Sequence, residues 1–207
     1  MPTQAPRRFL QLLVFAALVA AGAAHAQSAA AQVTRVRGTL QAVKADSVTL
    51  KTRGGEVVEL ALAPTVTFSE TYPVKLEDIK PGSFIGSGAM PQADGSQLAL
   101  AVTLFPESAR GSGEGHYPFE AVPQATMTNA TVAEVMGATE GRKLLVRYKD
   151  GEKVIVVPPE APVVSFRPGD RSLLVPGASV AVSVREVDGK LTAQRISAGR
   201  NGFALPY

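Results

Sequence analysis

The two halves of this 207-residue chain repeat the same order of sequence landmarks. A glycine turn, an alternating run, a proline-glycine pair and a second glycine turn follow one another in each half. The matching stretches are 52–68 with 148–166, 79–89 with 174–184, and 93–104 with 187–197. Self-similarity at a nearly fixed offset indicates repeated structural units. The sequence therefore predicts two copies of one fold.

Each copy has the pattern of β-strands. VTRVRGTLQAV and SVTLKT alternate apolar and polar residues at the period of a half-buried strand. Pairs that tolerate positive φ, and so favour tight hairpin turns, lie between the runs: Gly54-Gly55, Asp94-Gly95, Asp150-Gly151 and Asp188-Gly189. No stretch of the mature chain sustains a 3.6-residue apolar period. We therefore predict an all-β protein.

Five or six short strands in about 75 residues, with a helical turn before the fourth, are typical of a small OB-like barrel. We expect one barrel over 33–106, a second over 128–200 and an ordered linker over 107–127. The core expected for the first barrel contains Phe68, Ile79, Phe84, Leu98 and Leu100. The core expected for the second contains Val154, Val156, Phe166, Val180, Val182 and Leu191.

The stretch LEDIKPGSFIGSG followed by DGSQLALAVTL resembles a family of exported bacterial domains of unknown function. The resemblance implies small OB-like barrels, present here as a tandem pair. It covers 33–105 closely and 129–198 less closely, because RSLL replaces the LEDI turn in the second copy. The family has no assigned catalytic residues, so the resemblance implies none in this chain.

The first 26 residues have the pattern of a signal peptide. Arg7 and Arg8 precede the apolar run FLQLLVFAALVAAGAA, and a small-x-small motif ends at Ala26. We expect cleavage there, a periplasmic or secreted mature protein, and no membrane span after cleavage. Loss of the two arginines lowers the formal net charge from +3 to +1.

Composition excludes several kinds of chemistry. The chain has no cysteine, so it forms no disulfide, thiolate metal site or cysteine nucleophile. After cleavage His116 is the sole histidine, which excludes a zinc site that needs two imidazoles from one chain. We expect no metal, no cofactor and no catalytic residue. Nucleic acid is not an expected partner, because few aromatic residues accompany the Lys and Arg residues.

The stretch RGSGEGHYPFE at 110–120 is the candidate site. Glu114, His116, Tyr117 and Phe119 could bind a ligand in the seam between the two barrels. Alternatively, the two aromatic residues only hold the linker in that seam.

Three functions are compatible with these patterns. The first is a non-enzymatic binding or scaffolding protein of the bacterial cell envelope, with an unknown envelope protein as its partner. The alternative is a protein that binds a small ligand or cation through the seam. The third is an envelope hydrolase that uses a pair of carboxylates.

Overall fold

The computed structural model describes residues 33–137 and 142–206, so the predicted signal peptide lies outside the described residues. The described chain is all-β, as predicted. The strands are β1 (Thr34–Val43), β2 (Ser47–Thr52), β3 (Val57–Pro73), β4 (Phe84–Pro91), β5 (Gln97–Leu104), β6 (Gly115–Pro118), β7 (Thr126–Met136), β8 (Arg142–Tyr148), β9 (Gly151–Val157), β10 (Val163–Pro168), β11 (Ser179–Val187) and β12 (Lys190–Gly199). Three short 3₁₀ turns accompany them: η1 (Leu76–Asp78), η2 (Glu107–Ala109) and η3 (Arg171–Leu173).

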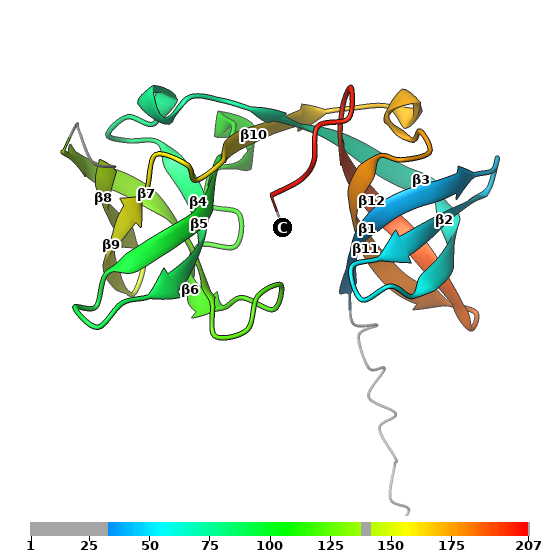
Figure 1. The fold of residues 1–207 in the computed structure, drawn as a ribbon, viewed down its shortest axis with the longest axis horizontal. Helices are drawn as coiled ribbons and strands as arrows, with labels where there is room; N and C mark the ends of the chain where they lie inside the picture. Colours follow the sequence, from blue (N-terminus) through cyan, green and yellow to red (C-terminus); the bar gives the residue numbers. More distant parts are fainter. Residues whose placement is uncertain (1–32, 138–141, 207) are drawn as a thin grey trace, which may run out of the picture. The chain divides into compact units, whose positions relative to one another are not determined.

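The first barrel closes around strands from both ends of the chain (Figure 1). β1 pairs with β2 on one side and β11 on the other, and β2 pairs with β3. β12 then pairs antiparallel with β11 and parallel with β3, which completes a closed ring of five strands. Closure leaves no open sheet edge that could recruit another chain.

The second barrel is built from one continuous stretch of chain. β4 pairs with β5 and β7, and β8 pairs with β7 and β9. A parallel contact between β5 and β9 closes this ring, also of five strands. The same arrangement of antiparallel and parallel pairs thus occurs twice.

The barrels do not follow the predicted boundaries 33–106 and 128–200. The first barrel takes β1 to β3 from one repeat and β11 and β12 from the other, and the second barrel takes the remaining strands. The cause is β3, which continues through Pro64 for 17 residues. At about 3.3 Å per residue this strand extends about 55 Å, so it carries the chain out of the first barrel. The segment 107–127 consequently connects β5 to β7 within the second barrel.

The junction between the barrels is a two-stranded ribbon. Ser69–Pro73 of β3 pairs antiparallel with Val164–Pro168 of β10. Figure 1 shows these two strands running side by side where the chain passes between the barrels. Phe166 packs edge-to-face on Phe105, which packs in the same way on Phe84, with centroid distances of 5.4 and 5.3 Å. Phe166 thus belongs to the junction and not to the centre of a barrel.

The two cores differ from the predicted ones in membership. Ile79 is buried in the second barrel, whereas Val180 and Val182 are buried in the first, each opposite to the prediction. Leu98 and Leu191 are 37% and 46% exposed, so both predictions of burial were wrong.

The other residues predicted for the two cores are buried to different extents. Phe84 is buried, as predicted, but it lies on β4 of the second barrel and not in the first. Phe68, Leu100, Val154 and Val156 are only partly buried. Along β5, β9 and β12 the buried positions belong to the alternate residues Ala99, Ala101, Ile155, Val157 and Ala193. Successive side chains of a strand point to opposite faces, so these residues face the interior and the leucines and valines beside them face outward.

Candidate functional site

The predicted site lies on the connection between β5 and β7. Its central part forms the short strand β6, which pairs with β7 from Gly115↔Asn129 to Pro118↔Thr126. The Oε1 atom of Glu114 accepts a hydrogen bond of 3.1 Å from the backbone N–H of Lys149, in the turn between β8 and β9. Glu114 therefore ties this connection to the neighbouring hairpin of the same barrel.

His116 is held by its own barrel. Its Nδ1 atom lies 2.8 Å from the hydroxyl of Thr128, and its ring stacks on Tyr148 at a centroid distance of 6.3 Å. Burial lowers the pKa of His116 below its ordinary value, and the positive charge of Lys153 lowers it further. The imidazole is consequently neutral near pH 7.

Tyr117 points away from the core and is 41% exposed. Its hydroxyl accepts a 3.1 Å hydrogen bond from Nδ2 of Asn129, which also donates to the carbonyls of Ser112 and Gly113. Burial raises the pKa of the Tyr117 phenol. The Oδ1 atom of Asn129 is buried and accepts no hydrogen bond from the described residues.

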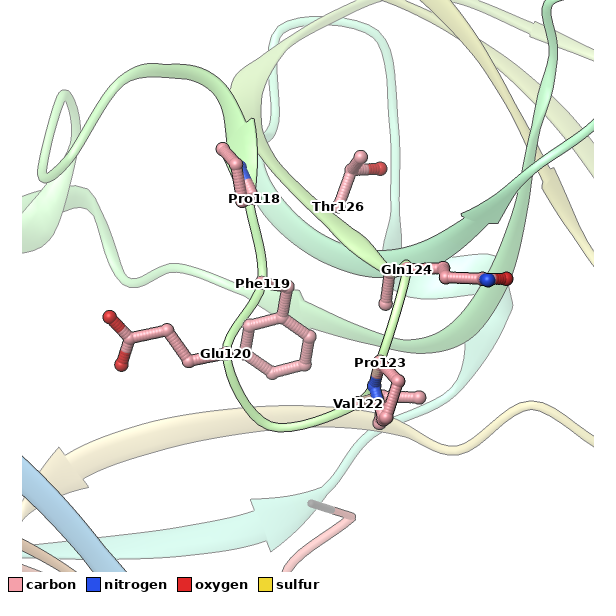
Figure 2. A pocket seen from close by; sticks show the side chains of 8 residues that line it. Pro118, Phe119, Glu120, Val122, Pro123, Gln124 and Thr126 are labelled. Carbon is pink, nitrogen blue, oxygen red and sulfur yellow. The ribbon is translucent and has the colours of Figure 1, made fainter.

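Phe119 is buried beneath its own loop. Figure 2 shows its ring enclosed by the turn from Pro118 to Thr126, with the Glu120 carboxylate pointing away from the ring. The lining of this shallow hollow is mostly apolar side chains of the loop itself, namely Pro118, Phe119, Val122, Pro123 and Ala125. The guanidinium of Arg37 in β1 lies 5.8 Å from the ring centroid. Phe119 thus touches the first barrel, whereas Glu114 and His116 bond to Lys149 and Thr128 of the second.

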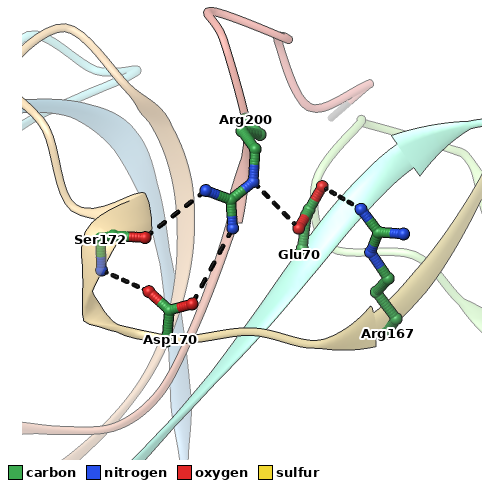
Figure 3. A network of polar contacts seen from close by, with 5 residues as sticks. All are labelled: Glu70, Arg167, Asp170, Ser172 and Arg200. Atoms are coloured by element: carbon green, nitrogen blue, oxygen red, sulfur yellow. Dashed lines mark hydrogen bonds and ion pairs between the residues drawn. The ribbon is translucent and has the colours of Figure 1, made fainter.

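The junction between the barrels also contains a network of charged residues that the sequence analysis did not predict. Glu70 is only 6% exposed, and its carboxylate binds Arg167 at 2.9 Å and Arg200 at 3.2 Å (Figure 3). Arg200 also lies 4.0 Å from Asp170. The hydrogen bond from Arg167, more than that from Arg200, holds the pKa of Glu70 below its usual value. Residues so far apart in the chain give no local signal of such a network.

Five carboxyl groups have a pKa below the ordinary value, which does not suit a general acid. Hydrogen bonds lower the pKa values of Glu59, Glu70, Asp94, Glu107 and Asp170. A hydrolytic acid near neutral pH needs a raised pKa. Within 33–137 and 142–206, moreover, no three His, Asp or Glu side chains gather as a metal site would require.

A second unpredicted feature is a basic face on the first barrel. It consists of the outward-facing cations Arg35, Arg37, Lys51, Arg53, Arg185 and Arg195. In the register of the sheet Ser183 pairs with both Arg35 and Arg195, so the two arginines flank it. Arg53 adjoins Arg37, because its N–H donates to the Arg37 carbonyl at 3.1 Å.

No acidic residue occurs in the strand segments that form the basic face. These segments are 34–40, 47–53, 179–185 and 192–199. The first two come from one repeat and the last two from the other. The face therefore exists only because the first barrel combines strands from both halves.

In the described part of the chain, no helix has the length and apolarity needed to cross a membrane. Comparison with family models, curated proteins and solved structures gives no match. The resemblance to exported domains of unknown function accordingly stays a prediction, and the function must be inferred from the geometry of the chain.

Proposed function

We propose that this protein is a non-enzymatic binding protein of the bacterial cell envelope, made of two OB-like barrels. The observation that carries the proposal is the basic face, where five of the six cations are exposed and only Arg37 is partly covered, by Phe119. Display of this kind suits recognition of a large partner. The predicted signal peptide supports a location in the envelope.

The contacts of the predicted linker site favour this function over a small-ligand site in the seam. Glu114 and His116 already use polar atoms in contacts with Lys149 and Thr128. A ligand would have to displace these bonds before it gained any of its own. The carboxylates near Arg200 are likewise neutralised by arginine, which disfavours the hydrolase.

Photo-crosslinking in intact cells tests the proposed function. A photoreactive residue at Ser183, in the middle of the basic face, should give a discrete adduct with an envelope component. The control places the same residue at Val175, which is 51% exposed but lies outside the four segments of the face. Equal adducts from both positions, or none from Ser183, would contradict the proposal.

A further inference from the structure

We propose that the basic face binds the phosphate groups of a linear polyanion. This inference rests on the proposed function and names the chemistry of the partner. It starts from the charges that the barrel leaves without counter-ions. No ion pair of the described residues involves Arg35, Arg53, Arg185 or Arg195. Their repulsion is a cost that a bound anion would remove.

The second barrel shows that the fold itself does not require these charges. β4 and β5 are the counterparts of β11 and β12 in the repeat, and neither contains a charged residue. On β8, Arg147 is paired with Glu152 at 3.3 Å. Two barrels with the same strand arrangement thus differ in the charge of one face. A difference that folding does not need points to recognition.

The type and spacing of the cations indicate phosphate. Five of the six are arginines, whose planar guanidinium matches the oxygens of a phosphate in two parallel hydrogen bonds. Arg35 and Arg37 are two residues apart on one strand, hence about 7 Å apart, and Arg195 lies two strands from Arg35, hence about 10 Å away. Such a set can contact several successive phosphates at once.

The side chains between the cations favour a polymer in solution over a membrane surface. The outward positions there are Thr39, Ser179, Ala181 and Ser183. None of them is a large apolar group that could enter the boundary of a lipid layer. A narrow chain, by contrast, can lie against these short side chains and still reach the arginines on both sides.

The C-terminal segment leaves most of the basic face uncovered. The backbone N–H of Leu205 donates to the Ser179 hydroxyl at 3.3 Å, and the Leu205 carbonyl accepts from Arg53 at 3.5 Å. Both contacts lie at the Ser179 end. Arg35, Arg185 and Arg195 lie toward the other end. Two aromatic residues of the second barrel adjoin the face: Phe119 lies against Arg37, and the charge of Arg35 acts on the phenol of Tyr117.

The test uses the purified protein and inorganic polyphosphate as the probe. We expect binding that weakens as salt rises, because each contact releases counter-ions. The double variant Arg35→Gln/Arg195→Gln should bind at least about tenfold more weakly, with a salt slope smaller by about 1.5 to 2. Its melting temperature should not fall below that of the wild type, because loss of two like charges relieves their repulsion.

The control Lys80→Gln/Lys143→Gln removes two exposed lysines outside the basic face and should bind as the wild type does. Equal weakening in both variants would mean that only net charge matters, which would overturn the proposal. So would equal binding of polyaspartate, binding of anionic phospholipid vesicles without polyphosphate binding, or binding of single-stranded DNA that depends on its bases.

The two proposals fail separately. An adduct at Ser183 in cells with no binding of polyphosphate would overturn the phosphate inference and leave the binding function in place. Polyphosphate binding that the double variant abolishes, with no adduct at Ser183 in cells, would instead contradict the proposed function.

Discussion

Glu70 contacts two arginines that come from different parts of the chain. Arg167 belongs to β10 and Arg200 directly follows β12, so one carboxylate joins the ribbon to the end of the first barrel. The bonds require the ionised carboxylate, and this is why its pKa is lowered. Their contribution to stability is therefore present above the ordinary glutamate pKa of about 4.3 and is lost as pH falls through the lowered value.

Glu70→Gln should lower the melting temperature by several degrees at pH 7, because two arginines lose a charged partner. The difference from the wild type should stay constant above about pH 5 and shrink below about pH 4. Urea unfolding from pH 3 to 7 measures it. Glu186→Gln, at an exposed position near the end of β11, is the control and should leave stability unchanged. A difference that persisted at pH 3 would count against the ionic role of Glu70.

His116 should show the opposite charge preference, since burial favours its neutral form. A histidine whose pKa is lower in the folded protein adds stability that is fully present above the unfolded value of about 6.5 and is lost as pH falls below it. NMR titration of the His116 ring should give a pKa below 6.5. The fall in unfolding free energy between pH 7 and 5 should be smaller in His116→Gln. A ring that titrated above 6.5 would contradict the buried environment.

At the scale of the elements, Gly38 allows β1 and β2 to approach closely. A Cβ atom at this position would lie 2.1 Å from the carbonyl oxygen of Lys51, which belongs to the backbone and cannot rotate away. The closeness accompanies the register shift between Leu40 and Ala42, where β1 bends around the barrel. Closed barrels use bulges and glycines for such bends.

Gly38→Ala should therefore destabilise the protein by about 1–3 kcal/mol through overpacking. Gly54→Ala is the matched control. Its Cβ would meet only the Thr52 side chain, at 3.7 Å, and its effect should stay within about 0.5 kcal/mol. Denaturant unfolding of both variants gives the comparison. Equal losses of stability in the two variants would contradict the close approach of β1 and β2 at Gly38.

The positions of the strands could be predicted from the sequence better than the pairing between them. Alternation and glycine turns indicate strands correctly, because both are local properties of the chain. The predicted helical turn before the fourth strand is present as the 3₁₀ turn Leu76–Asp78. Nothing local specifies whether β4 and β5 return to the barrel they follow or join the next one. The boundaries 33–106 and 128–200 assume that consecutive strands form one barrel. The assignment of Ile79 to the first core, and of Val180 and Val182 to the second, depends on the same assumption.

At the scale of the whole molecule, a cross-link can test the strand partnership directly. Thr39 pairs with Ser179 in the register of β1 and β11, and both side chains face outward. Because the chain has no cysteine, Thr39→Cys/Ser179→Cys introduces the only two thiols. Neighbouring positions of this kind are close enough for a disulfide. We expect an intramolecular bond, detected as a linked peptide pair by mass spectrometry.

The two other outcomes of that experiment are informative. Two free thiols in a folded protein would place these residues in separate barrels, as the boundaries 33–106 and 128–200 require. A covalent dimer would mean that the pairing occurs between two chains. Thr39→Cys with Val175→Cys serves as the control, because Val175 lies in the loop before β11 and outside its pairing with β1.

The candidate site could be predicted only in part. The sequence singles out Glu114, His116, Tyr117 and Phe119 through their unusual composition, and the structure gathers them on one connection of the second barrel. The basic face gave no such signal, because its cations are spread over residues 35 to 195 and the chain has a formal net charge of only +3. Pairing between distant strands, and not local composition, creates it.

The divided first barrel has a consequence for the order in which the chain folds during synthesis. The second barrel is complete once β9 has been made, and it can close at once. β1 to β3 must wait for β12, about 150 residues after β1, which takes roughly 8 to 30 seconds at about 5–20 residues per second. Throughout that interval the side chains of Leu40, Leu50 and Leu60 are not yet buried by β11 and β12. A chaperone that bound the nascent N-terminal hairpins would therefore protect this protein at its most vulnerable stage.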